Sequence, residues 1–73
     1  MKKFMLNGPF ITLGQFLKVN DYINSGGEAK FFLCNHDVLL NGEKITQRGK
    51  KLYHDDFVKV ESDIYKIIYD QKN

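Results

Sequence analysis

Residues 25–42 read Ser-Gly-Gly-Glu-Ala-Lys-Phe-Phe-Leu-Cys-Asn-His-Asp-Val-Leu-Leu-Asn-Gly, and the remaining elements are arranged around them. Ser25 and Glu28 have the spacing of a capping box, which predicts that a helix begins at Ser25. Ala29, Phe32 and Leu33 follow at helical spacing, so they would share one apolar face.

The same stretch changes character after residues 35–36, where the helix should end. Val38 and Leu40 alternate as in a half-buried strand. Asn41-Gly42 follows and is the strongest short signal for a two-residue type I′ turn. Residues 43–46 would then return antiparallel to Val38–Leu40. The sequence therefore predicts a short helix that leads directly into a β-hairpin.

A second helix is predicted upstream of this stretch. Thr12 and Gln15 form another capping box. Leu13, Phe16 and Leu17 make an apolar face, and the helix should end near residues 19–21. Gly14 in the first turn costs up to about 1 kcal/mol of helix stability, which suggests that another segment packs closely there. The two helices should pair as an αα-hairpin.

Residues 4–6 are a short apolar run typical of an edge strand, and residues 64–69 have strong β propensity. The last strand could pair with the first. We expect an α+β fold: a two-helix αα-hairpin packed on a small curled, mostly antiparallel sheet of four to five strands. Seventy-three residues suit a single domain, residues 1–73, with a small core.

Composition narrows the functional classes. The chain is 42% hydrophobic, 14% aromatic and has one cysteine, Cys34, which excludes an intramolecular disulfide and suits a reducing compartment. We expect a cytoplasmic monomer without a membrane segment, because no run approaches 18 apolar residues.

Positive charge is concentrated in one loop. The net charge is only +2, yet residues 44–54 contain Lys44, Arg48, Lys50 and Lys51 and no acidic residue. The other 62 residues carry seven basic and nine acidic side chains. Such a cluster is typical of an anion-binding surface, with a simple solvated loop as the alternative.

Residues 12–60 resemble the RNA-binding domain named after ribosomal small-subunit protein four, also called the αL motif. The matching positions run in register without an insertion. They are Leu13 with Leu17, Ser25 with Ala29-Lys30, Phe32-Leu33, Val38-Leu39-Leu40-Asn41-Gly42, and Asp55-Asp56 before Phe57-Val58. The stand-alone YaaA subfamily is most similar, on Gly-Gly-Glu-Ala-Lys at 26–30 and Arg-Gly-Lys-Lys-Leu at 48–52.

Three positions depart from the family pattern. Gly26 stands where many members have an arginine that contacts phosphate. His36 replaces a glycine that commonly ends the second helix, and Asp55 replaces a glycine of the closing turn. Histidine and aspartate both tolerate the left-handed backbone better than β-branched residues.

The resemblance implies a non-catalytic module that binds structured RNA, ribosomal or transfer RNA, by shape and backbone. Backbone N–H groups at Gly26 and Gly27 would offer an anion site at the start of the second helix, with a tight approach to the first helix as the alternative reason for these small residues. The predicted RNA-binding residues are Ser25, Gly26, Gly27, Lys30, His36, Lys44, Arg48, Lys50, Lys51 and Lys18. No cofactor and no metal are expected, and the ribosome or another protein could be a further partner.

Other functions are less well supported. Cys34, His36 and His54 lack the spacing of a zinc site, and we expect Cys34 to be a buried or half-buried apolar residue. His54-Asp55-Asp56 resembles a general-base pair but has no nucleophile beside it. The main rival is a protein-docking factor that uses Leu39, Tyr53, Tyr65 and Tyr69. Single-stranded DNA binding would need aromatic side chains in the basic groove, and we expect most aromatics in the core.

Overall fold

The computed structural model describes residues 1–70. Its strands are β1 (Lys2–Met5), β2 (Phe10–Thr12), β3 (Val38–Leu40), β4 (Glu43–Lys44), β5 (Lys51–Tyr53), β6 (Phe57–Val60) and β7 (Asp63–Ile68). Its helices are α1 (Leu13–Val19), α2 (Ala29–Asn35) and the single 3₁₀ turn η1 (Gly26–Glu28). The predicted α+β class, with two helices packed on a mostly antiparallel sheet, is confirmed.

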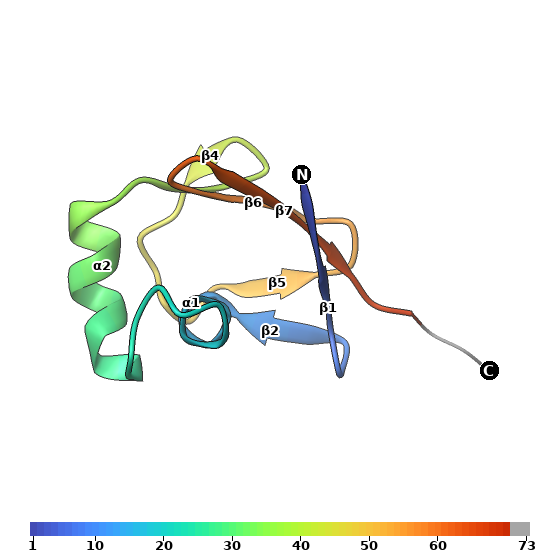
Figure 1. Cartoon of the computed structure of the whole chain (residues 1–73), viewed down its shortest axis with the longest axis horizontal. Coiled ribbons are helices and arrows are strands. Elements are labelled where there is room, and N and C mark those ends of the chain that lie inside the picture. Colours follow the sequence, from blue (N-terminus) through green and yellow to red (C-terminus); the bar gives the residue numbers. More distant parts are fainter. Residues whose placement is uncertain (71–73) are drawn as a thin grey trace.

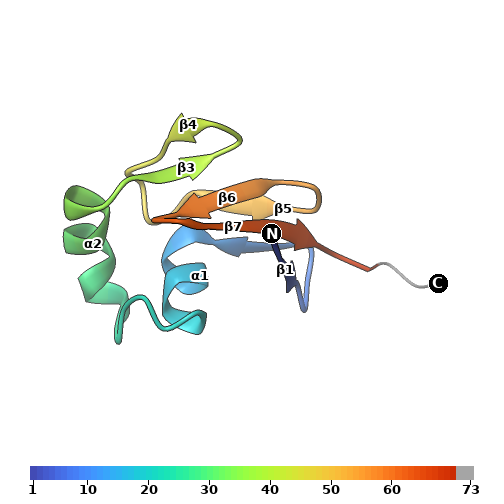
Figure 2. The ribbon, with the colours of Figure 1, turned by 45° about the horizontal axis from the view of Figure 1, so that its top comes forward.

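Five strands form the main sheet in the order β1-β7-β6-β3-β4. All neighbours are antiparallel except β1 and β7, which run parallel with Lys2 opposite Tyr65. The predicted pairing of the first and last strands is thus confirmed, with β1 at the edge. Helix α2 lies at one end of the elongated molecule, and the end of β7 points toward the other (Figures 1 and 2).

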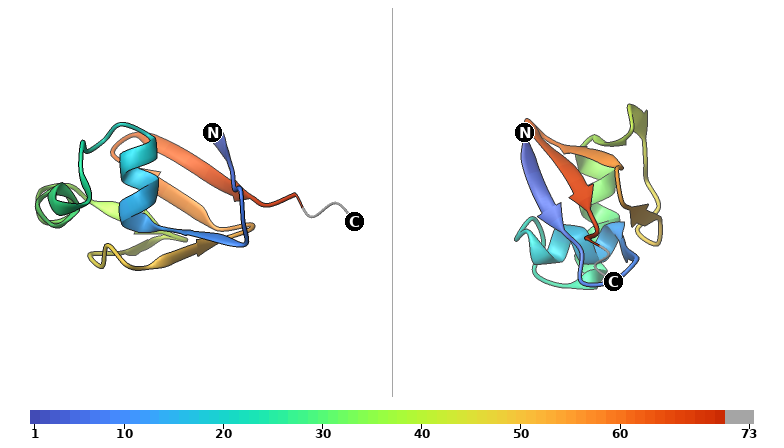
Figure 3. Two further views of the ribbon diagram at one scale, coloured as in Figure 1. Left: turned by 90° about the horizontal axis from the view of Figure 1, so that it is seen from below. Right: turned by 90° about the vertical axis from the view of Figure 1, so that its right-hand side faces the viewer.

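A second, two-stranded sheet was not predicted. β2 and β5 pair antiparallel, with Phe10 opposite Tyr53, Ile11 opposite Leu52 and Thr12 opposite Lys51. We call this pair the β2–β5 ribbon. It lies beside the start of α1, because Thr12 ends β2 and also caps the helix (Figure 3). Lys51, expected in the basic loop, is therefore the first residue of a strand.

The two predicted capping boxes have different outcomes. Thr12 Oγ1 accepts from the Gln15 N–H at 3.3 Å and Gln15 Oε1 accepts from the Thr12 N–H at 3.1 Å, so that box is confirmed. Ser25 makes no side-chain cap, and the Glu28 carboxylate accepts from the Asn24 N–H instead. The second capping box is therefore absent. A helical segment does begin after Ser25, but Gly26–Glu28 form a 3₁₀ turn before α2, because two glycines weaken α-helix formation.

The hairpin after α2 is as predicted. Asn41 and Gly42 have φ angles of 51° and 89°, both positive as a type I′ turn requires. The Asn41 side chain accepts from the Phe57 N–H at 2.9 Å and donates to Asp56 at 3.1 Å. These bonds join the turn to the start of β6. His36 ends the helix in extended backbone (φ −133°), so no left-handed residue is needed there. Asp55, with φ 72°, does occupy the left-handed region.

The core lies between the helices and the concave face of the sheets. Its centre is Phe16, fully buried and edge-on to both Phe4 and Tyr65, with ring centroids 5.0 Å apart in each pair. Leu13, Leu17, Ala29 and Leu33 are buried as predicted, while Phe32 is half-buried. Cys34 is exposed, contrary to expectation. Five residues after Ala29, it lies well off the helix face that Ala29 and Leu33 define.

Candidate nucleic-acid interface

The basic loop is held by the first turn of α1. A helix leaves its first N–H groups without partners inside the helix, and here the Leu13 N–H donates to the Lys50 carbonyl and the Gly14 N–H to the Arg48 carbonyl, both at 2.8 Å. The Lys50 N–H in turn donates to Gln47 at 3.2 Å, closing the loop as a turn. The carbonyls of Arg48 and Lys50 are therefore engaged with α1, and their side chains are exposed.

Gly14 permits this close approach. A Cβ atom at Gly14 would lie 3.3 Å from the Arg48 carbonyl oxygen and 3.8 Å from the Ala29 Cβ. The close neighbours of Gly14 are thus the Arg48 backbone and the Ala29 side chain. The loop, the start of α1 and the start of α2 thus meet at one point.

A shallow hollow of about 280 Å³ opens at this junction, lined by Thr12, Gly14, Gln15, Gly26, Arg48 and Gly49. The Arg48 guanidinium lies 3.5 Å from the Gly26 carbonyl, at the long limit of a hydrogen bond. We call the exposed surface formed by Gly26, Arg48, Gly49, Lys50 and Lys51 the Arg48 surface. Lys30, also exposed, follows Ala29 at the same end of α2.

The cations here lack carboxylate partners. Within residues 1–70, Lys2, Lys44 and Lys66 lie beside carboxylates, as do the rings of His36 and His54, and none of these contacts involves Arg48, Lys50, Lys51 or Lys30. A cation without an internal counter-ion keeps its full charge available to an external anion.

Two predicted residues lie elsewhere and are already paired. Lys44 Nζ lies 3.2 Å from the Asp37 carboxylate, and His36 Nδ1 lies 3.1 Å from Glu61. His36 also stacks on Phe32, with ring centroids 4.3 Å apart. We call the surface formed by His36, Asp37, Lys44 and Glu61 the Glu61 surface. It lies at the C-terminal end of α2, whereas the Arg48 surface lies at the N-terminal end.

A hydrogen-bonded aromatic group lies next to the Glu61 surface. The Tyr22 hydroxyl is 2.7 Å from that of Tyr65 and 3.2 Å from Asp63, and its ring contacts Phe32 with centroids 5.7 Å apart. Burial, followed by the hydrogen bond with Tyr65, raises the pKa of the Tyr22 phenol. These contacts fix the α1–α2 connection onto β7.

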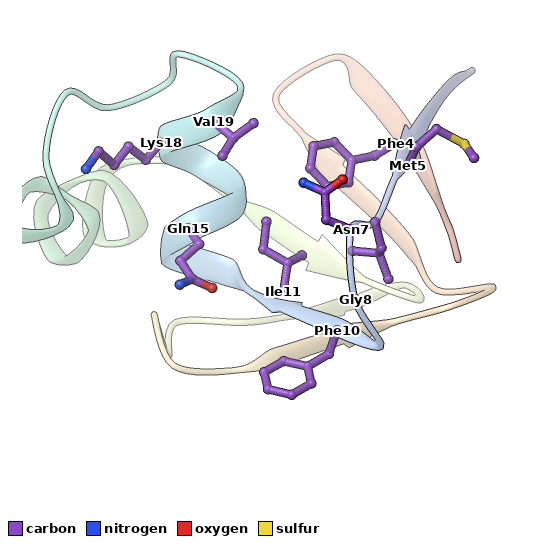
Figure 4. A pocket seen from close by; sticks show the side chains of 10 residues that line it. Phe4, Met5, Asn7, Gly8, Phe10, Ile11, Gln15, Lys18 and Val19 are labelled. Carbon is purple, nitrogen blue, oxygen red and sulfur yellow. The ribbon is translucent and has the colours of Figure 1, made fainter. Parts of the chain in front are cut away.

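Lys18 borders a different depression. An open apolar hollow of about 740 Å³ lies between α1 and the β1–β2 turn, and Lys18 is its one charged lining residue. In Figure 4 the lysine extends away from the hollow, while Ile11 points toward Phe4. The lining residues are Phe4, Met5, Leu6, Asn7, Gly8, Phe10, Ile11, Gln15, Lys18 and Val19.

The residues considered for chemistry have structural partners. His54 Nδ1 accepts from the Tyr69 N–H at 2.9 Å, and its Nε2 lies 3.4 Å from Asp55. Asp56 accepts from the Tyr53 N–H at 2.7 Å. Residues 1–70 contain no group of three or more His, Cys, Asp or Glu side chains placed to hold a metal. Neither helix in this range is long and apolar enough to cross a bilayer.

The rival docking patch is only partly exposed. Tyr53 is exposed, but Leu39 and Tyr69 are half-buried, and Tyr65 is buried against Phe16 and Tyr22. Tyr65 cannot therefore contact a partner as the rival interpretation requires. In β7, alternate residues face the core, and Tyr65 and Ile67 are the inward pair.

Comparison with known proteins gives two matches. The family model of the S4 domain matches residues 4–68. The chain is also similar to a Bacillus subtilis (strain 168) protein named probable ribosome maturation protein RlbA. The two are 59% identical over 51 residues, which cover 70% of this chain and 72% of the relative.

Proposed function

The chain belongs to the S4 domain family, and from this premise we propose that it is a non-catalytic protein that binds structured RNA on the Arg48 surface. The family membership confirms the resemblance found in the sequence. The name of the B. subtilis relative refers to ribosome maturation, which favours ribosomal RNA, or a precursor of it, as the ligand over transfer RNA.

One observation carries the proposal. Arg48, Lys50 and Lys51 have no ion-pair partner in the described chain, and the carbonyls of Arg48 and Lys50 are bonded to the first turn of α1. A loop whose backbone is already held presents these unpaired cations to a phosphate backbone without having to order its main chain on binding.

Neighbouring residues extend this surface. Lys30 would hold a second phosphate, and the small residues Ser25, Gly26 and Gly27 would let the RNA backbone approach η1 closely. The contribution from a helix N-terminus is smaller than the sequence indicated, because a 3₁₀ turn replaces the first α-helical turn. His36 and Lys44 would lie outside the contact, and Lys18 would reach only its edge.

Such a surface reads RNA by shape rather than sequence, since phosphate contacts carry no base information. Four cations, Lys30, Arg48, Lys50 and Lys51, would neutralise about four phosphates. The logarithm of the binding constant should then fall against the logarithm of salt concentration with a slope of about −3 to −4.

The test is a salt titration of the purified protein with a ribosomal RNA hairpin labelled with a fluorophore. A slope in the expected range supports the Arg48 surface. A slope near zero would contradict it, as would partner capture from lysate that survives nuclease and salt at about 0.5 M, several-fold above physiological. That second result would favour a protein partner.

A further inference from the structure

We propose that the outer face of the β2–β5 ribbon is a stacking platform for an unpaired RNA base, formed by Phe10 and Tyr53. The inference rests on the proposed function and deepens it, because it adds single-stranded nucleotides next to the paired RNA as part of the ligand.

The strand register puts these aromatics on one face. Opposite residues of an antiparallel pair point the same way and successive residues alternate, so Phe10, Thr12, Lys51 and Tyr53 share the outer face, while Ile11 and Leu52 face inward. Leu52 is fully buried, whereas Phe10 and Tyr53 remain 39% and 48% exposed. In Figure 4, Phe10 projects from the ribbon on the side opposite Ile11.

The two rings form a compact exposed pair. Their centroids lie 6.0 Å apart at an interplanar angle of 51°, and Lys51 Nζ lies 4.7 Å from the centre of the Phe10 ring. An aromatic ring with an unpaired cation beside it offers a base a stacking surface and offers the attached phosphate a counter-charge.

The platform is continuous with the Arg48 surface. Lys51 belongs to both, and Thr12 on the same face also lines the hollow beside Arg48. Two residues along a strand span about 7 Å, so a nucleotide adjoining a phosphate held at Lys50 or Lys51 can reach Tyr53. The ribbon itself has no acidic residue.

Phe57 provides a matched comparison within the chain. It has the same 39% exposure as Phe10, and Lys66 lies 5.6 Å from its ring centre. However, Lys66 is 3.8 Å from the Asp55 carboxylate, so its charge is already paired. Phe57 is on β6, away from the Arg48 surface, and should not stack a base.

The experiment compares two RNA probes. One is a fully paired ribosomal RNA hairpin, and the other is the same hairpin with a three-nucleotide single-stranded 3′ extension containing 2-aminopurine. The wild-type protein should bind the extended probe about tenfold more tightly than the fully paired hairpin, which is the gain in affinity expected from stacking one base. The 2-aminopurine fluorescence should change when the complex forms.

Phe10→Leu and Tyr53→Leu should each reduce this tenfold preference severalfold without weakening binding to the paired hairpin. Phe10→Tyr should retain the wild-type preference because it keeps an aromatic ring, and Phe57→Leu should leave the preference unchanged. Thermal unfolding of each variant, measured in parallel, would identify any loss of folding; Phe10→Tyr retains the ring and tests the platform if Phe10→Leu is unstable.

Equal affinity of the wild-type protein for both probes would overturn the platform and leave the proposed function intact, as would variants that keep the tenfold preference. Equal binding of both probes together with a protein partner that is lost in Phe10→Leu would assign the aromatic pair to protein docking. Failure of the wild-type protein to bind either probe would instead overturn the proposed function itself.

Discussion

At the N-terminal end of α2, the Arg48 surface carries cations without carboxylate partners, whereas at the C-terminal end Lys44 lies beside Asp37 and the His36 ring beside Glu61. Both ends contain residues that the sequence marked as RNA-binding. The difference shows that the number of basic residues in a segment does not measure the charge available to a polyanion. What matters is which carboxylates the fold brings within reach.

Reversing charge on the Arg48 surface should give the largest effect. At salt near 0.1 M, counterion release contributes close to tenfold in affinity per phosphate contact, so Lys50→Glu/Lys51→Glu should weaken binding to a ribosomal RNA hairpin by about 100-fold or more. The melting temperature should remain nearly unchanged, because both side chains are exposed. Unaltered affinity would show that this surface does not contact RNA.

Displacing the loop should be almost as damaging. Valine at position 14 would press on the Arg48 carbonyl, which would already lie 3.3 Å from a Cβ there. Gly14→Val should therefore shift the loop and reduce hairpin affinity at least about tenfold, through loss of one or more phosphate contacts. Gly8→Val is the matched control, because a Cβ at Gly8 meets no atom within 4 Å. Full affinity in Gly14→Val would mean that loop position is unimportant.

Neutralising one lysine at each end tests the comparison directly. Lys50→Gln should lower hairpin affinity by up to about tenfold. Lys44→Gln should lower it by less than about threefold, because the Asp37 carboxylate beside Lys44 offsets its charge as seen by the RNA. Fluorescence titration at one salt concentration measures both variants. Equal losses would remove the distinction between the two ends.

The smallest expected effect concerns stability beside the Glu61 surface. Tyr22→Phe removes the hydroxyl that contacts Tyr65 and Asp63 and should cost about 1 kcal/mol of unfolding free energy at pH 7. The raised pKa of Tyr22 means that the folded protein keeps a proton that the unfolded chain releases above about pH 10. The extra unfolding free energy of the wild-type protein over Tyr22→Phe is therefore fully present below about pH 10 and is lost as the pH rises further.

Urea unfolding of both proteins at pH 7 and at pH values above 10 measures this difference. RNA affinity at pH 7 should be the same in the two proteins, since Tyr22 lies outside the Arg48 surface. A stability gap that widens with pH would contradict the assigned direction of the pKa shift.

Local patterns predicted the elements that depend on neighbouring residues. Thr12 with Gln15, the α1 apolar face and the Asn41-Gly42 turn all form as expected, because each is stabilised by contacts a few residues apart. The β2–β5 ribbon escaped prediction because its strands have three residues each and lie far apart in the chain. The alternation of Lys51, Leu52 and Tyr53 was the available signal, with one buried residue between two exposed ones.

The candidate site was less accessible to sequence reasoning. The basic window was evident, but the ion pair of Lys44 with Asp37 and the contact of His36 with Glu61 depend on the folded hairpin. Phe10 went unrecognised because its aromatic partner lies across the ribbon. Phe16 and Phe32 were both expected in the core; Phe16 is fully buried, whereas Phe32 is only half-buried.

The parallel ladder between β1 and β7 has a consequence for synthesis of the chain. Lys2 lies opposite Tyr65, and Phe16 of α1 packs on the same Tyr65. A nascent chain that has emerged only through β6 therefore lacks β7, which is both the pairing partner of β1 and the strand whose Tyr65 packs on α1. Such distant pairings slow folding. The domain should therefore become compact, with the Arg48 surface in its final position, only once β7 has left the ribosome.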